Sequence, residues 1–454
     1  MMKPGGITLK INLAREICTL SMFPTFNALA LLSFPYIEFS ILTRSAGFFS
    51  VQLVANAVFF DLLVSSLVSG VPSSVRTRVG GRFITRGHEE ISELFWGSLL
   101  LAIPALLVSL AVEMIIPSFA IWLESNVAMA DALKVYMKIS VFSLPFSVIQ
   151  SCATAYLVGQ KKTRFRIISA FILQTAYIGA ILILFRGGQR LSFSLAAEII
   201  GKASLVSSVV GAFSMTAISF FMTRPRKIHY FTILKTALSL VPQSLHGSMM
   251  QIVLTVSTVA VLRCGTILAY PGSLLFSLFL RYARDLCSLG RGVGEGLSIF
   301  VSNRKVQQLE SDVRIAPYVS SAIVTFLLAL IIPLLVLMLQ NLVVVGVPNQ
   351  LQADMPKYIP AFFLGVALDC STICFLYAMQ GMKKNQVALR ASVFGQLVIS
   401  VPMTYLLCYI IKPNFLDFFY CFVAQKILFF ICVAYLWHKI NPKHIWADTI
   451  NVHA

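Results

Sequence analysis

Apolar segments long enough to cross a lipid bilayer recur along this chain from one end to the other. In a bilayer core every backbone amide and carbonyl must find its hydrogen bond within the protein, so such segments fold as helices or as strands of a closed barrel. Long continuous apolar runs are typical of helices, whereas a barrel uses short segments of alternating polarity. The mean hydropathy of +0.84 and a charged fraction of 12% agree with this reading. We therefore predict an all-α integral membrane protein.

Twelve transmembrane helices are predicted. They cover residues 16–42, 48–75, 94–118, 134–157, 165–186, 192–222, 236–262, 271–300, 316–340, 357–379, 386–410 and 415–437. The first follows several basic residues and is too long for a signal-peptide core, so we expect it to be retained.

The basic residues alternate from loop to loop. On the twelve-helix assignment, 24 lysines and arginines fall in loops on one side, 8 on the other and 4 within the spans, which accounts for all 36. Cytoplasmic loops are the ones enriched in lysine and arginine. Both termini are therefore predicted to lie in the cytoplasm, and a bacterial inner (plasma) membrane is the expected location. The net charge of +18 is explained by this topology, so we expect no nucleic-acid partner.

A turn of the chain occurs twice with the same neighbours. Gly159-Gln-Lys-Lys and Gly381-Met-Lys-Lys lie 222 positions apart (381 minus 159), and Gln174 and Gln396 have the same separation. A shared offset over such different residue types indicates an internal duplication. We predict two six-helix bundles related by pseudo-twofold symmetry, with a central cleft between them. Their expected limits are residues 1–221 and 235–454, joined by a cytoplasmic linker over residues 222–234.

Ionisable residues inside the predicted spans are the candidate functional residues, because each costs several kcal/mol in a membrane unless it is paired or hydrated. Glu38 and Asp369 have no basic residue four positions away, so each is expected to need a cavity, an ion or a partner on another helix such as Arg284. The candidates for a substrate cleft are Asp61, Gln251, Arg281, Arg284 and Asp285.

Structural roles are open for several of these side chains. Arg281 with Asp285, and Glu198 with Lys202, have the spacing of an ion pair along one helix. Asp61 could hydrogen-bond a neighbouring helix. Lys426, in the last span, could snorkel, pair with another helix or contact a substrate.

No motif of an enzyme or a nucleotide-driven pump is present. Residues 290–296 (GRGVGEG) lack the Lys-Ser/Thr of a phosphate-binding loop, and within a membrane helix such glycines favour close helix packing. The nine cysteines show no pattern of a zinc site or a disulfide framework. We expect no enzymatic activity, no metal and no cofactor other than a coupling ion.

The chain resembles the MATE (multidrug and toxic compound extrusion) family of the MOP flippase superfamily over its whole length. The resemblance rests on Pro24 followed by an acid late in the first span, and on glycines that end the second and eighth spans. It rests most on Asp369, twelve residues before Gly381. By this resemblance Asp369 is similar to a cation-site ligand of sodium-coupled members, and Glu38 stands where the family usually has aspartate.

The sequence also departs from the family. Met250 or Gln251 occupies the region in which sodium-coupled members have a glutamate, and the asparagine and aspartate of the amino-terminal proton site are not seen in the fifth span. Arg281 and Arg284 are unusual for an exporter of cationic drugs.

The resemblance implies a secondary antiporter in which H⁺ or Na⁺ drives export of organic or drug-like solutes, with Glu38 and Asp369 as coupling sites. The alternative is a MOP-type flippase or exporter of an anionic lipid-linked sugar or a phosphate-bearing solute, for which Arg281 and Arg284 would be ligands. A major-facilitator transporter is a third possibility. The expected partners are a small-molecule solute or lipid-linked substrate and membrane lipids, and we expect a monomer.

Overall fold

The structure is a computed structural model that describes residues 12–22, 25, 49–85, 88–124, 126–185, 192–225, 230–265, 272–307, 309–343, 349–406 and 415–440. These residues are almost entirely helical and include no strand. The predicted all-α class is confirmed.

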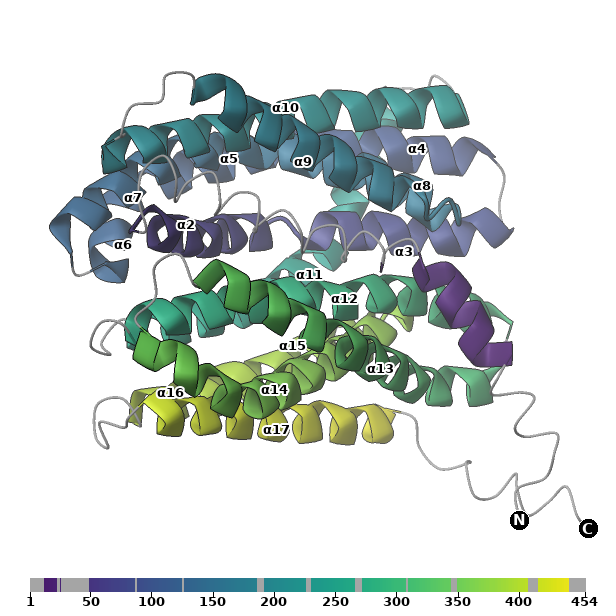
Figure 1. Cartoon of the computed structure of the whole chain (residues 1–454). Helices are drawn as coiled ribbons and strands as arrows, with labels where there is room; N and C mark the ends of the chain where they lie inside the picture. Colours follow the sequence, from purple (N-terminus) through teal and green to yellow (C-terminus); the bar gives the residue numbers. More distant parts are fainter. Residues whose placement is uncertain are drawn as a thin grey trace, which may run out of the picture.

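The helices form two groups that follow one another along the chain (Figure 1). The first group, in the upper part of Figure 1, consists of α2 (Phe49–Ser66), α3 (Gly70–Thr85), α4 (His88–Leu100), α5 (Ala102–Glu113), α6 (Ile116–Leu123), α7 (Val127–Ser140), α8 (Leu144–Gly159), α9 (Phe165–Leu184) and α10 (Phe193–Thr223). The second consists of α11 (Tyr230–Gly265), α12 (Gly272–Val306), α13 (Glu310–Val343), α14 (Asn349–Gly381), α15 (Asn385–Ser392), a π-helical segment (Val393–Ser400), α16 (Val401–Leu406) and α17 (Phe415–Ile440). Helix α11 packs against α3 and α4 of the first group as well as α15 of the second.

Among the described residues, nine helical segments are long and apolar enough to cross a membrane, and a tenth is formed if α2 and α3, bent by 52°, are one span. The predicted eighth span is present as α12, but it carries too many charges to be counted with the others. Most of the predicted first span lies outside the described residues. The chain is therefore a multi-pass helical membrane protein, and the number twelve stays a prediction.

The duplicated turns have the same backbone conformation. Lys161 and Lys383 adopt φ angles of 62° and 61°, the left-handed region that non-glycine residues rarely enter. The amides of Lys161 and Lys162 donate to the carbonyls of Val158 and Leu157. The amides of Lys383 and Lys384 donate to Gln380 and Met379, the positions 222 residues later. Both turns thus end a helix with the same Schellman motif.

The helix packing beside these turns is also duplicated. A Cβ atom added at Gly159 would lie 2.8 Å from Cβ of Val79 and 2.9 Å from the carbonyl oxygen of Arg76. One added at Gly381 would lie 3.1 Å from Cβ of Val301 and 2.7 Å from the carbonyl oxygen of Ser298, again 222 positions on. Only glycine allows α8 to approach α3, and α14 to approach α12, so closely. These contacts support the internal duplication at the level of packing.

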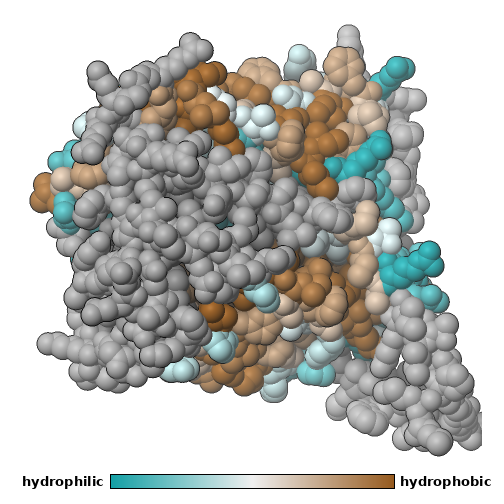
Figure 2. Space-filling view, viewed as in Figure 1, coloured by the Kyte–Doolittle hydropathy of each residue, from teal (hydrophilic) through white to brown (hydrophobic). Residues whose placement is uncertain are grey.

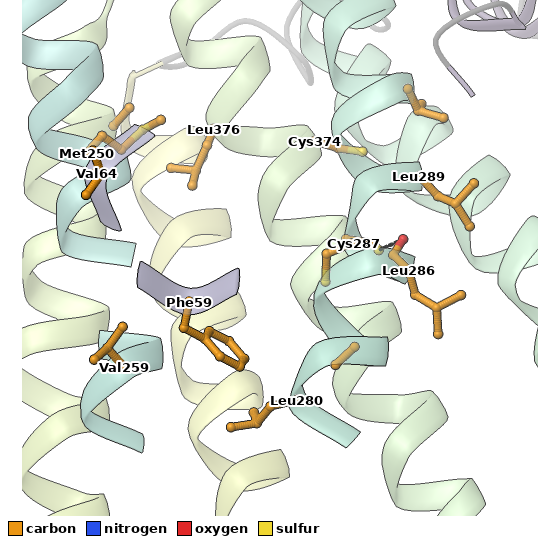
Figure 3. Close-up of a cluster of buried hydrophobic side chains, with 14 of the residues drawn as sticks. Phe59, Val64, Met250, Val259, Leu280, Leu286, Cys287, Leu289, Cys374 and Leu376 are labelled. Atoms are coloured by element: carbon orange, nitrogen blue, oxygen red, sulfur yellow. Dashed lines mark hydrogen bonds between the residues drawn. The ribbon is translucent and has the colours of Figure 1, made fainter. Parts of the chain in front are cut away.

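Apolar side chains fill the space between α2, α11, α12 and α14 (Figure 3). Phe59 of α2, Leu280 of α12 and Leu376 of α14 are buried in this core. The outer surface is apolar as well, as expected for contact with lipid. Phe171 on α9 and Phe213 on α10 are among the most exposed large side chains. In Figure 2, much of the visible described surface above and below the grey region is apolar, and hydrophilic residues are most frequent towards the right-hand end.

We call that end the basic end. It is defined by the turns that hold Lys161, Lys162, Lys383 and Lys384 and by Arg304 near the end of α12. These residues belong to the loops predicted to be cytoplasmic.

Candidate functional site

Helix α12 carries a row of charged side chains along the junction of the two helix groups. Arg281, Arg284, Asp285, Arg291 and Glu295 are separated by three, four or about seven positions, and residues at these spacings lie on one face of a helix. Each of them lines a cavity. The sequence prediction singled out the first three.

The central cavity has a volume of about 340 Å³ and lies between α12 and the helices α2, α7, α8, α9 and α10. Asp61 accepts a hydrogen bond from the hydroxyl of Tyr136 on α7, so the predicted contact with a neighbouring helix is present. Nε of Arg281 lies 3.9 Å from Oδ2 of Asp285, which confirms the predicted pairing along α12. Both members of that pair face the cavity together with Arg284.

Arg284 lies between two cavities. It lines the central cavity and also a smaller C-terminal cavity of about 100 Å³. Its Nη1 atom is buried and has no hydrogen-bond partner among the described residues. A buried guanidinium nitrogen without an acceptor is energetically costly. Arg284 can therefore accept an anionic group from either cavity.

The C-terminal cavity contains Asp369, whose Oδ2 atom lies 2.7 Å from Nζ of Lys426 on α17. The ammonium group of Lys426 also lies 4.9 Å from the centre of the Phe422 ring, a cation–π distance. Of the three roles considered for Lys426, the structure shows the pair between helices. The carboxylate of Asp369 faces the cavity but is already neutralised.

A π-helical segment brings Gln396 to the same cavity. In this segment the widened turn places Gln396 where its Oε1 atom accepts a hydrogen bond from Ser257 of α11 at 2.7 Å. Such bulges are frequent at functional sites. Gln251, another predicted cleft residue, lines this cavity and a third one.

The third cavity, of about 220 Å³, lies near the basic end and is called the basic-end cavity. Oε1 of Glu295 on α12 lies 3.1 Å from Nη1 of Arg76 on α3 and 3.3 Å from Nη2 of Arg166 on α9. The guanidinium group of Arg76 is also 5.4 Å from the centre of the Tyr377 ring. These contacts join the two helix groups.

Sequence reasoning missed Glu295 because it lies within GRGVGEG, where only the glycines were interpreted. The packing part of that interpretation holds: a Cβ atom on Gly290 would lie 2.8 Å from Cα of Cys370, and one on Gly294 would lie 2.8 Å from the Tyr377 ring. The missed signal was the position of Glu295 four residues after Arg291, in line with the other α12 charges.

At the opposite end from the basic turns, Glu124 is buried after α6. Nδ2 of Asn56 on α2 donates a hydrogen bond to its carboxylate. Burial raises the pKa of Glu124, and the hydrogen bond from Asn56 and the charge of Arg263 on α11 oppose the shift. This contact could not be predicted from local spacing, because Asn56 and Glu124 are 68 positions apart.

Two further predictions concern residues away from the cavities. Nζ of Lys202 lies 2.5 Å from Oε1 of Glu198, so these residues form the predicted pair along one helix. Glu38 lies outside the described residues. In the part of the chain that the structure describes, no group of three or more His, Cys, Asp and Glu residues could hold a metal ion.

No protein-family model and no curated protein sequence matches this chain. Solved structures do match. The eukaryotic MATE transporter AtDTX14 superimposes with a TM-score of 0.77 over 98% of both chains at 14% sequence identity. An outward-facing multidrug resistance MATE family transporter of the MOP superfamily gives 0.74 over 97% of both chains, also at 14% identity.

A MOP superfamily transporter from Pyrococcus furiosus gives a TM-score of 0.72 at 15% identity, over 94% of this chain and 96% of that one. The polarity of its binding pocket is described as reversed, which suggested a different function for that protein. The chain described here therefore has the fold of the MATE transporters, as the resemblance in sequence implied.

Proposed function

We propose that this chain, folded as a MATE transporter, is a secondary transporter that carries an organic solute bearing a phosphate or carboxylate group. The solute would occupy the central cavity, and the two helix groups would rock to expose that cavity to each side of the membrane in turn. Both termini would lie in the cytoplasm, the protein would act as a monomer, and a bacterial inner membrane is the location we propose.

The observation that carries this proposal is Arg284, whose buried Nη1 atom has no hydrogen-bond partner among the described residues. It faces the central cavity beside Arg281. Among the described residues that line the central cavity, Arg281 and Arg284 face two acids, Asp61 and Asp285, which contact Tyr136 and Arg281. The unpartnered nitrogen of Arg284 therefore favours an anionic solute, and a planar guanidinium group can bind phosphate or carboxylate through two parallel hydrogen bonds.

The test is transport by purified protein in liposomes, with a sugar phosphate and a cationic dye supplied separately. We expect uptake of the sugar phosphate, and we expect Arg284→Gln to lower its initial rate about tenfold or more, since a charge-assisted hydrogen bond contributes about 1.5–3 kcal/mol. Arg284→Lys should retain part of the rate because an ammonium group keeps the charge but not the paired geometry. Arg164→Gln is the control, because Arg164 is exposed and lines none of the three cavities.

Transport of the dye without the sugar phosphate, unaffected by Arg284→Gln, would contradict this proposal. That result would favour the second candidate, the export of drug-like solutes coupled to H⁺ or Na⁺ entry. The second candidate is supported by Asp369, because its carboxylate lines the C-terminal cavity and could exchange Lys426 for a coupling cation. Its own test is gradient-driven efflux by Asp369→Asn and Glu38→Gln, which should abolish coupling in protein that remains folded.

A further inference from the structure

The basic-end cavity contains more positive charge than its contacts require. Arg76, Arg166 and Arg291 line it with a single acid, Glu295. Both ion pairs use the same oxygen of Glu295, Oε1. The other oxygen, Oε2, and Nε of Arg76 are buried without hydrogen-bond partners among the described residues. One carboxylate thus leaves the hydrogen-bonding capacity of this cluster partly unused.

The remaining polar lining consists of the side-chain amides of Gln251 and Gln380, the Tyr377 hydroxyl and six further hydroxyl groups. These six belong to Ser65, Ser69, Ser73, Ser147, Ser151 and Thr154. Arginine together with hydroxyl donors is a chemistry suited to phosphate oxygens. The volume of about 220 Å³ is below the range of about 300 Å³ and more that is typical of drug-sized ligands. The cavity has room for a charged head group and not for a whole large solute.

We infer that the basic-end cavity is a second anion site, in which Arg76 and Arg166 bind a phosphate group in exchange for the carboxylate of Glu295. The site is separate from Arg284 and is the first to be reached from the basic end. The phosphate class of ligand rests on the proposed function. The exchange with Glu295 rests on the contacts of this cluster alone.

The exchange has a mechanical consequence, because Arg76 and Arg166 belong to the first helix group and Glu295 to the second. Ser73 of α3 and Gln380 of α14 are also joined across the groups by a hydrogen bond of 3.2 Å. A phosphate group held by the two arginines releases Glu295, so ligand binding weakens the connection between the groups at this end. The ligand therefore opens the passage through which it moves inward.

The first experiment measures binding of pyrophosphate to the purified full chain by calorimetry. Glu295→Gln removes the competing carboxylate and is expected to tighten binding about tenfold or more, whereas Arg166→Gln is expected to weaken it about tenfold. Arg164→Gln is the matched control, because Arg164 lies two positions before Arg166 and its side chain is exposed. This variant should bind pyrophosphate as the unmodified chain does. Binding that is absent from all variants, or that Glu295→Gln weakens, would overturn the inference.

The second experiment measures opening. In the variant Ser151→Cys, the new thiol lies in the lining of the cavity and should react with a water-soluble maleimide several-fold faster when pyrophosphate is present; the parent protein is the blank for the native cysteines. In the double variant that also carries Glu295→Gln, the maleimide reaction should be fast even without pyrophosphate. Equal rates in all cases would show that Glu295 does not hold this end closed.

A third arm identifies the source of the phosphate group. In nanodiscs, phosphatidic acid that competes with pyrophosphate indicates a lipid-linked ligand, and its failure to compete indicates a soluble one. Failure of this inference is distinguishable from failure of the proposed function. If Arg284→Gln abolishes transport while pyrophosphate binding is unchanged by Glu295→Gln and Arg166→Gln, only the second site is wrong.

Discussion

Replacing Lys426 by methionine tests the energetic role of the pair in the C-terminal cavity. Methionine keeps most of the length of the lysine stem but leaves the carboxylate of Asp369 without its partner at 2.7 Å. Coulomb's law gives an attraction of about 6 kcal/mol at this distance for an effective dielectric constant of about 20. Removing both charges from water cancels much of this gain. The side chains are 12% and 21% exposed, so some hydration from the cavity remains.

We therefore expect a coupling free energy of about 2 kcal/mol between the two residues. The assay is a double-mutant cycle with Lys426→Met, Asp369→Asn and the double variant, in which the free energy of unfolding is measured by denaturant titration in mixed micelles. Lys426→Met alone should be the least stable, because it buries an unpaired carboxylate. The double variant should recover most of the loss. If the two substitutions are simply additive, the ion pair contributes nothing and the reasoning is refuted.

Two more predictions concern stability. Gly159→Ala and Gly381→Ala should each lower the free energy of unfolding by about 1–3 kcal/mol, because the added methyl group meets backbone and side-chain atoms of the facing helix. Gly179→Ala on α9 is the control, because a Cβ atom at Gly179 would have no neighbour within 4 Å. Equal effects at all three positions would contradict the packing argument. Glu124→Gln should remove a pH dependence of the free energy of unfolding. Burial raises the pKa of Glu124 in the folded protein above its unfolded value near 4.5. The folded state therefore holds the proton more tightly, and it loses stability as the pH rises from the unfolded pKa to the folded one. Relative to the parent, the glutamine variant should gain stability as the pH is raised above the unfolded pKa near 4.5. The measurement is thermal unfolding as a function of pH, and parallel curves for the two proteins would contradict this cause.

Much of the architecture could be predicted because the membrane restricts the choices. Apolar runs in lipid are expected to be helices, and from Phe165 onward each predicted span overlaps a described helical segment, with ends that differ by up to eight residues where both are described. The duplication was also visible, since the turns at Lys161 and Lys383 need the same unusual backbone and kept the same residues around it.

The site was predicted less completely, for a physical reason. Ionisable residues inside apolar runs could be singled out from the sequence because placing them in a membrane costs free energy. Arg284 and Asp369 were predicted as candidates in this way. Their partners could not be predicted, because Lys426 is brought to Asp369, and Arg76 to Glu295, by packing between helices distant in the sequence. Pairs along one helix, such as Arg281 with Asp285, depend only on local geometry and were predicted correctly.

The close contacts at Gly159 and Gly381 restrict how this protein can move. Since α8 touches the backbone of α3, and α14 that of α12, neither helix can slide along or rotate against its neighbour without a steric clash. Helices α8 and α3 are therefore expected to move together as one rigid unit, and so are α14 and α12. Displacement at the basic end then falls on the boundary between α3 and α12, where the buried pair of Arg76 and Glu295 must separate and each group needs a new partner.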